Sequence, residues 1–141
     1  MRSFFDTNVL VYLFDQDTPG KRETTRTLFE SEAQSGRLII STQVLQEWYV
    51  TVTRKLAEPL PSKDAEQTIR HFATFPVVRI DIEHVIGAAN RCQVLGFSFW
   101  DALIIETALS GGSSILYTED MQHGQVIDGL TIINPYVQSS T

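Results

Sequence analysis

The sequence has little cysteine, little proline and no long hydrophobic run. It contains one cysteine and five prolines in 141 residues, which excludes an internal disulfide and a proline-rich or collagen-like chain. There is no Cys-x-x-Cys pair and no Cys/His cluster, so a zinc site is also excluded. No segment approaches the roughly 18 apolar residues of a membrane span, and an acid, Asp6, precedes any apolar region of the kind found in a signal peptide. We therefore expect a cytoplasmic protein that does not associate with membranes.

Basic residues are also scarce. The chain carries 11 Lys and Arg against 17 Asp and Glu, for a net charge of −6. Proteins that clamp nucleic acid by charge alone are usually basic, so this balance argues against such a clamp. An acidic protein can still bind an anionic partner if it first binds a metal ion. The length and the absence of linkers or repeats predict a single domain over residues 1–137, with a frayed tail at 138–141.

Short β-rich runs alternate with helical segments along most of the chain. This alternation predicts an α/β domain whose central, largely parallel, five-stranded sheet is covered by helices on both faces. In such sheets ligands bind beyond the carboxyl ends of the strands. The predicted strands are Ser3–Phe5, Arg37–Ser41, Val77–Ile80, Ser114–Tyr117 and Leu130–Ile133. The predicted helices begin at Thr7, Thr18, Thr42, Ser62, about Glu83 and Ser98.

Four acidic positions map to that edge of the sheet. Asp6 ends the first strand, Glu47 flanks the apolar stripe of a helix, Asp101 lies among apolar residues, and Glu119-Asp120 follows the fourth strand. Each has a structural explanation when taken alone: a helix N-cap, a solvated helix side, a capping box with the preceding serine, and a polar turn. Their convergence is better explained by a hard cation, because clustered carboxylates repel unless they ligate one. The convergence of these acids therefore predicts a site for a hard cation such as Mg²⁺ or Mn²⁺.

Four motifs resemble those of the PIN-domain ribonucleases, and within them the toxins of VapBC-type toxin–antitoxin pairs. The motifs are Phe5-Asp6-Thr7-Asn8-Val9-Leu10, Gln46-Glu47, Trp100-Asp101-Ala102-Leu103-Ile104 and Leu116-Tyr117-Thr118-Glu119-Asp120.

The resemblance covers nearly the whole chain and implies a three-layer fold. It also implies metal-dependent hydrolysis of RNA phosphodiester bonds, a cognate antitoxin, and a homodimer. The resemblance implies that Asp6, Glu47, Asp101 and Asp120 bind Mg²⁺ or Mn²⁺ and are catalytic. Thr7, Asn8 or Thr118 would orient ligands or water. The residues after the fourth motif, Met121 to Gly124, depart from the family pattern, so either Glu119 or Asp120 is the fourth ligand.

Two other functions are compatible with the fold class. A haloacid-dehalogenase-like phosphatase also has an Asp after its first strand, but its chemistry needs a second acid two positions later, where this chain has Asn8. An inactive binding module of the PIN fold is the other alternative. Trp48 and Trp100 could stack on bases, but both fit the apolar faces of helices, so we predict that they belong to the core. We predict that the three histidines have surface or loop roles. The candidate phosphate contacts are Lys21, Arg22, Arg26, Arg54 and Lys55.

Overall fold

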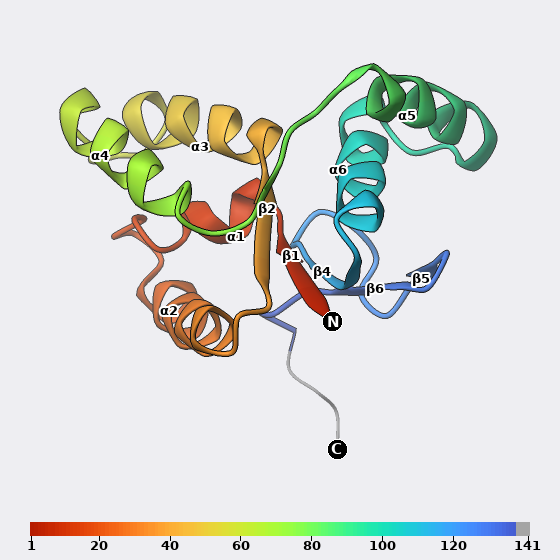
Figure 1. The fold of residues 1–141 in the computed structure, drawn as a ribbon. Helices are drawn as coiled ribbons and strands as arrows, with labels where there is room; N and C mark the ends of the chain where they lie inside the picture. The colour runs from red at the N-terminus through yellow and green to blue at the C-terminus, as the bar shows by residue number, and fades with distance from the viewer. Residues whose placement is uncertain (138–141) are drawn as a thin grey trace.

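The computed structural model describes residues 1–137, so the predicted frayed tail at 138–141 lies outside the described residues. The first half of the chain forms β1 (Arg2–Phe5), α1 (Thr7–Val11), α2 (Pro19–Gln34), β2 (Leu38–Ser41), α3 (Thr42–Arg54) and α4 (Ser62–Phe72). The second half forms β3 (Val77–Val78), α5 (Ile82–Leu95), α6 (Phe99–Ser110), β4 (Ser113–Tyr117), β5 (Val126–Ile127) and β6 (Leu130–Ile133). Figure 1 shows their arrangement.

The sheet is largely parallel, as predicted. Within residues 1–137 its strand order is β3-β2-β1-β4-β6-β5, and each neighbouring pair is parallel except β5 and β6. The prediction of five strands was wrong, because β5 adds a sixth. This strand has two residues, too few to show an alternating pattern, and it pairs with β6 through a tight turn. Asp128 and Gly129 in that turn both have positive φ, at 51° and 88°, which fits a two-residue hairpin.

The helices cover both faces of the sheet, giving three layers. Figure 1 shows α1, α2, α3 and α4 on one side of the strands and α5 and α6 on the other. Strand residues such as Phe4, Ile40 and Leu116 are fully buried between these layers. Trp48 is also fully buried, in edge-to-face contact with Phe14, which confirms its predicted place in the core.

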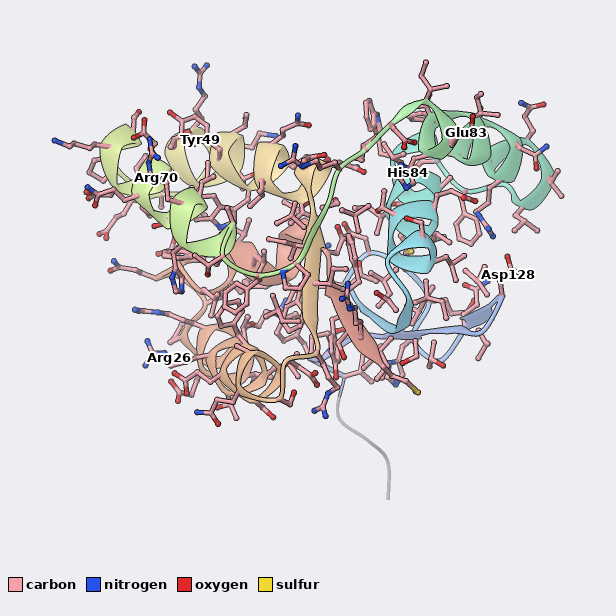
Figure 2. The ribbon with its side chains drawn as sticks, in the orientation of Figure 1. Arg26, Tyr49, Arg70, Glu83, His84 and Asp128 are labelled. Atoms are coloured by element: carbon pink, nitrogen blue, oxygen red, sulfur yellow. The ribbon has the colours of Figure 1, made fainter. Side chains whose placement is uncertain are left out.

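Helices α5 and α6 pack closely against each other. A Cβ atom on Gly87 of α5 would lie 2.7 Å from the Glu106 carboxylate of α6, so only glycine allows this approach without a shift. At the start of α5, His84 completes a capping box with Asp81, and its Nε2 atom lies 2.8 Å from Ser110 Oγ on α6. Figure 2 shows His84 between the two helices.

Helix boundaries differ from the predictions by a few residues. Helix α1 ends at Val11, and α3 ends at Arg54, before the two prolines expected to stop it. Ser41, the last residue of β2, caps α3 by accepting a hydrogen bond from the Val44 amide. No helix among residues 1–137 is long and apolar enough to cross a membrane.

The direction in which the chain crosses the sheet changes at β1. Strand β1 pairs with β2 on one side and with β4 on the other. The connections on its two sides therefore run in opposite directions across the sheet. In open parallel sheets such a switch point leaves a crevice at the carboxyl ends of the strands. The residues after β1 and β4 are therefore the first place to look for a site.

Candidate active site

A cavity of about 610 Å³ lies where that rule places it. Its walls come from the segments that follow β1 and β4 and from helices α3 and α6. All four predicted acids, Asp6, Glu47, Asp101 and Asp120, line this acidic cavity. The predicted convergence of these residues is therefore present in the fold, although they are separated by up to 114 positions in the chain.

Asp6 is the most deeply buried of the four, with only 5% of its surface exposed. It ends β1 and caps α1, and its Oδ1 atom accepts a 2.7 Å hydrogen bond from the Thr7 amide. Burial raises the pKa of Asp6 to about 7, and the charges of Asp120 and Glu47 add to this effect. Hydrogen bonds from Thr118 and Thr7 oppose it without overcoming it. The structural explanation of Asp6 as an N-cap is thus correct, but an N-cap alone does not require burial among like charges.

Three neutral polar residues each donate a hydrogen bond to one of the four acids. Thr118 Oγ1 donates to Asp6 at 2.8 Å, and Thr7 Oγ1 donates to Glu47 at 2.9 Å. The Asn8 side-chain amide donates to Asp120 at 2.7 Å. Thr7, Asn8 and Thr118 were the residues expected to orient ligands, and each contacts a predicted acid.

Asp101 lies in the first turn of α6, where Ser98 is the N-cap. The Ser98 hydroxyl accepts a 3.1 Å hydrogen bond from the Asp101 amide. Burial raises the pKa of the Asp101 carboxyl, Ser98 opposes that shift, and the charge of Asp120 adds to it. The side chain therefore faces another carboxylate as well as the helix terminus, which a purely structural capping residue would not need.

Glu119 and Asp120 lie in different surroundings. Glu119 does not line the cavity; its carboxylate forms an ion pair with Lys21 of α2 and accepts a 2.5 Å hydrogen bond from the Tyr12 hydroxyl. Burial raises the pKa of Glu119, but the hydrogen bonds from Lys21 and Tyr12 outweigh it and leave the pKa lowered. Asp120 lines the cavity and is held by Asn8. This arrangement favours Asp120 over Glu119 as the fourth member of the site.

The acids are not clustered tightly. Among the described residues, no three Asp, Glu, His or Cys side chains are close enough to hold a metal ion together. Asp6, Glu47 and Asp120 are instead hydrogen-bonded to neighbouring Thr or Asn side chains. The side chains of the cavity wall nevertheless suit a hard cation. They offer carboxylate and neutral oxygen atoms as ligands, and no histidine or cysteine is among them.

The histidines have structural roles within residues 1–137. His84 caps α5, His123 accepts a hydrogen bond from the Asn134 amide, and His71 packs edge-on against Phe75. None of the three lines the acidic cavity.

Sequence reasoning misplaced one residue of the cavity wall and did not single out several others. Trp100 was predicted to belong to the core, but 62% of its surface is exposed and it lines the cavity. Asp15 and Gln43 also line it and carried no strand-end or motif signal, and Gln46 was noted only as the neighbour of Glu47. Of the basic candidates, Lys55 lines the cavity, whereas Lys21 is paired with Glu119.

Comparison with known sequences identifies one matching family. The profile described as "PIN domain" matches residues 3–127, which is most of the chain. None of the curated protein sequences compared with the chain matches it significantly.

Several solved structures share the fold. A toxin–antitoxin complex from Klebsiella pneumoniae superimposes with a TM-score of 0.70 at 22% identity, over 95% of this chain and 98% of that chain. VapC20 of Mycobacterium tuberculosis, a toxin that cleaves the sarcin–ricin loop, gives 0.67 at 20% identity, over 84% and 89%. DNA-bound VapBC from Salmonella typhimurium gives 0.65 at 20% identity, over 94% and 96%. At these identities the likeness demonstrates a common fold.

Proposed function

This chain belongs to the PIN domain family, and from that premise we propose that it is a divalent-metal-dependent endoribonuclease and the toxin of a toxin–antitoxin pair. The structures that share its fold include a toxin that cleaves RNA and toxin–antitoxin complexes. Their activities support the proposal because the match extends over nearly the full length of both chains.

One observation carries the enzymatic part of the proposal. The four predicted carboxylates come from four separate segments and line a single cavity together with Asp15, and the most buried of them has a pKa raised to about 7. Such an arrangement destabilises the fold at neutral pH, because the charged form of Asp6 is disfavoured by burial and by its neighbours. A bound cation would offset this repulsion, which gives the cluster a functional reason to exist.

Asp6, Glu47, Asp101 and Asp120 would hold Mg²⁺ or Mn²⁺. When bound, such an ion lowers the pKa of water and neutralises charge on a scissile phosphate. The protein's own polar residues position the carboxylates: Thr118 holds Asp6, and Asn8 holds Asp120. The acidic cavity would otherwise repel RNA, so cation binding and substrate binding are coupled.

The geometry does not favour a phosphatase that uses Asp6 as a covalent nucleophile. That reaction needs a general acid two positions after the nucleophile. Asn8 occupies the position, and its side-chain amide donates to Asp120, so it cannot supply a proton. An inactive binding module would not need to keep all four carboxylates in one cavity.

An RNA cleavage assay tests the enzymatic proposal. Purified protein should cleave RNA with Mg²⁺ or Mn²⁺ and lose that activity in EDTA. Asp6→Asn and Asp101→Asn preserve side-chain size but remove the ligand charge, and each should abolish cleavage. Asp128→Asn is a matched control, because Asp128 pairs with Arg91 outside the cavity and Asn tolerates its positive φ. Full activity in EDTA, or in both cavity variants, would refute the proposal.

The proposed partner is an antitoxin whose segment covers the acidic cavity. An Arg or Lys side chain from such a segment would pair with the carboxylates and exclude both metal and RNA. Purification from the native host should therefore yield this chain together with a small protein that inhibits cleavage. Isolation of the active chain alone, combined with harmless overexpression, would contradict the toxin assignment.

We also propose a homodimer that acts in the cytoplasm, where its RNA substrate and its antitoxin are present. Ile82, Val85 and Ile86 on α5 are exposed apolar side chains that self-association would bury. Light scattering on the purified protein should give twice the 15.9 kDa chain mass, and Ile86→Glu should shift the protein towards monomer. A monomeric wild-type protein at micromolar concentration would refute the dimer.

A further inference from the structure

Trp100 is an exposed aromatic residue in the wall of an acidic cavity. It is 62% exposed and directly precedes Asp101, and both residues line the cavity. The other tryptophan, Trp48, is completely buried. A large apolar ring left in water next to charged groups is unfavourable for stability, so its position calls for an explanation outside folding.

The indole of Trp100 is mounted on a rigid support. It lies in the first turn of α6, where the following residues Ala102, Leu103 and Ile104 are buried in the core. The Phe99 ring packs against it edge-to-face, with ring centroids 5.2 Å apart. A ring held in this way loses little conformational freedom when a flat ligand stacks on it.

A second observation places an open hydrogen-bond acceptor beside this ring. Gln43 of α3 is only 3% exposed, and its Nε2 atom donates to the Trp100 carbonyl at 3.4 Å. If the Gln43 amide were flipped, its Oε1 atom would face the Trp100 carbonyl oxygen, and two acceptors would be in contact. Nε2 therefore faces that carbonyl. The Oε1 atom is then buried with no hydrogen-bond partner among the residues the structure describes, although Gln43 lines the cavity. A buried acceptor of this kind is costly unless a ligand or water donates to it.

We propose that Trp100 and Gln43 form a nucleotide subsite beside the carboxylates, in which an unpaired base of the substrate stacks on the Trp100 indole and the same nucleotide donates a hydrogen bond to Gln43 Oε1. This inference rests on the proposed ribonuclease function and specifies its substrate: RNA with an unstacked nucleotide next to the scissile phosphate. Either a base N–H group or the ribose 2′-hydroxyl can supply the hydrogen bond, since both are donors.

A nucleotide fits these two residues better than a protein partner does. Trp100 and Asp101 line the same cavity, so one RNA strand can place a base on the indole and a phosphate at the carboxylates. Bases stack on aromatic side chains irrespective of sequence, and single-stranded RNA is recognised mainly through bases that have left the helical stack. The Trp100 ring can stack on the aromatic base of a nucleotide, and the buried Gln43 oxygen can accept a hydrogen bond from the edge of the base or from the ribose.

Cleavage kinetics on a single-stranded oligoribonucleotide that the wild type cleaves provide the first test. Removing a stacking ring costs about 5- to 100-fold in affinity, so Trp100→Leu should raise KM by that factor while kcat changes much less. Trp100→Phe keeps a ring and should restore most of the loss. Val126→Ala is the matched control, because Val126 is equally exposed at 62% but lies outside the cavity. Fully base-paired RNA should be cleaved poorly by the wild type.

Fluorescence provides a readout that does not depend on activity. Trp48 is buried and shielded from acrylamide, so quenching of the chain's emission reports on Trp100. In the wild type with Mn²⁺, a stopped-flow measurement made before cleavage should show that the same oligoribonucleotide protects Trp100 from quenching, whereas an oligonucleotide abasic at the nucleotide next to the cleavage site should not. A 2′-deoxy substitution there distinguishes the donors: if it has the same effect as Gln43→Met, the ribose hydroxyl donates to Gln43, and if it has no effect, the base does.

The outcomes separate this inference from the function on which it rests. If the wild type does not cleave RNA, the proposed function fails. If it does cleave, but Trp100→Leu has an unchanged KM and RNA leaves acrylamide quenching unaltered, the subsite is refuted. Loss of antitoxin binding in Trp100→Leu together with unchanged RNA kinetics would also refute it, because Trp100 would then be part of a protein interface.

Discussion

The burial of Asp6 should make the metal-free protein lose stability as the pH rises. In the folded state this carboxyl keeps its proton up to about pH 7, whereas its ordinary value is 3.8. Between these two pH values the folded protein binds more protons than the unfolded chain, so folding is favoured at low pH and weakened at high pH. The stability that the protonated form provides is present below about pH 4 and is lost as the pH rises through 7.

The size of the effect follows from the two pKa values. With 1.36 kcal/mol for each pKa unit, the difference in the Asp6 pKa between the folded and unfolded states lowers the free energy of unfolding, relative to low pH, by about 4 kcal/mol at pH 8 and by about 1.5 kcal/mol at pH 5. Asp6→Asn is neutral at both pH values. The Asn side chain loses part of the hydrogen bonding with Thr7 or Thr118, but that loss does not change with pH. The stability difference between variant and wild type should therefore shift by about 2–3 kcal/mol in favour of the variant from pH 5 to pH 8.

Thermal unfolding followed by circular dichroism in EDTA measures this difference. For a domain of this size 1 kcal/mol corresponds to about 3–4 °C in Tm, so the Tm of Asp6→Asn should gain roughly 6–10 °C on the wild type between the two pH values. Asp128→Asn controls for the loss of a negative charge, because Asp128 is exposed, and its Tm should run parallel to that of the wild type. A constant gap between Asp6→Asn and wild type from pH 5 to pH 8 would show that burial does not perturb Asp6, and the electrostatic argument for the site would fail.

Two further predictions concern metal binding and the segment after β4. Mn²⁺ at a hundredfold excess over Kd should stabilise the wild type by about 2.7 kcal/mol; Asp101→Asn should lose most of this response in a melting experiment, and an undiminished response would remove Asp101 from the site. Lys21→Met removes the cation that lowers the pKa of Glu119 and should reduce stability at pH 7 by about 1 kcal/mol. This loss should shrink as the pH falls below 4.5 and through the lowered pKa of Glu119, and it should be absent from the double variant Lys21→Met/Glu119→Gln. A loss that stays constant from pH 7 into the acid range would contradict the ion-pair explanation.

The positions of the acids relative to the strands were predictable because they depend on short-range signals. Asp6 directly follows an apolar run and precedes a helix, so its place at the end of β1 follows from the local pattern alone. The segment after β4 is equally clear. Parallel strands bring their carboxyl ends to one edge, which is why the shared location of Asp6 and Asp120 could be inferred without coordinates. Asp101 follows from the Ser98 cap at the start of α6.

Other features depend on residues far apart in the chain. Glu119 and Asp120 are neighbours with similar side chains, and nothing local distinguishes them. The choice comes from Lys21, 98 positions away, which pairs with Glu119, and from Asn8, 112 positions away, which holds Asp120. The local pattern could narrow the fourth acid to two residues, but only the packing of α1 and α2 against the end of β4 separates them.

Trp100 shows most clearly where sequence reasoning reached its limit. An apolar residue in an apolar helix is expected to be buried, and α6 is apolar on nearly all sides, with Leu103, Ile104 and Ile105 in the core. In such a helix, periodicity contains no information about which side faces water. Exposure at Trp100 is decided by the position of its neighbours: α5 and the sheet cover the body of α6, while the first turn projects into the acidic cavity beside Gln43. The sequence by itself predicted three of the four carboxylates, narrowed the fourth to two neighbouring residues, and placed them at the carboxyl edge of the sheet, because the positions of the strands and their parallel direction follow from local patterns. The tertiary structure decided which further side chains surround those carboxylates, because that depends on the packing of helices that are distant in the chain.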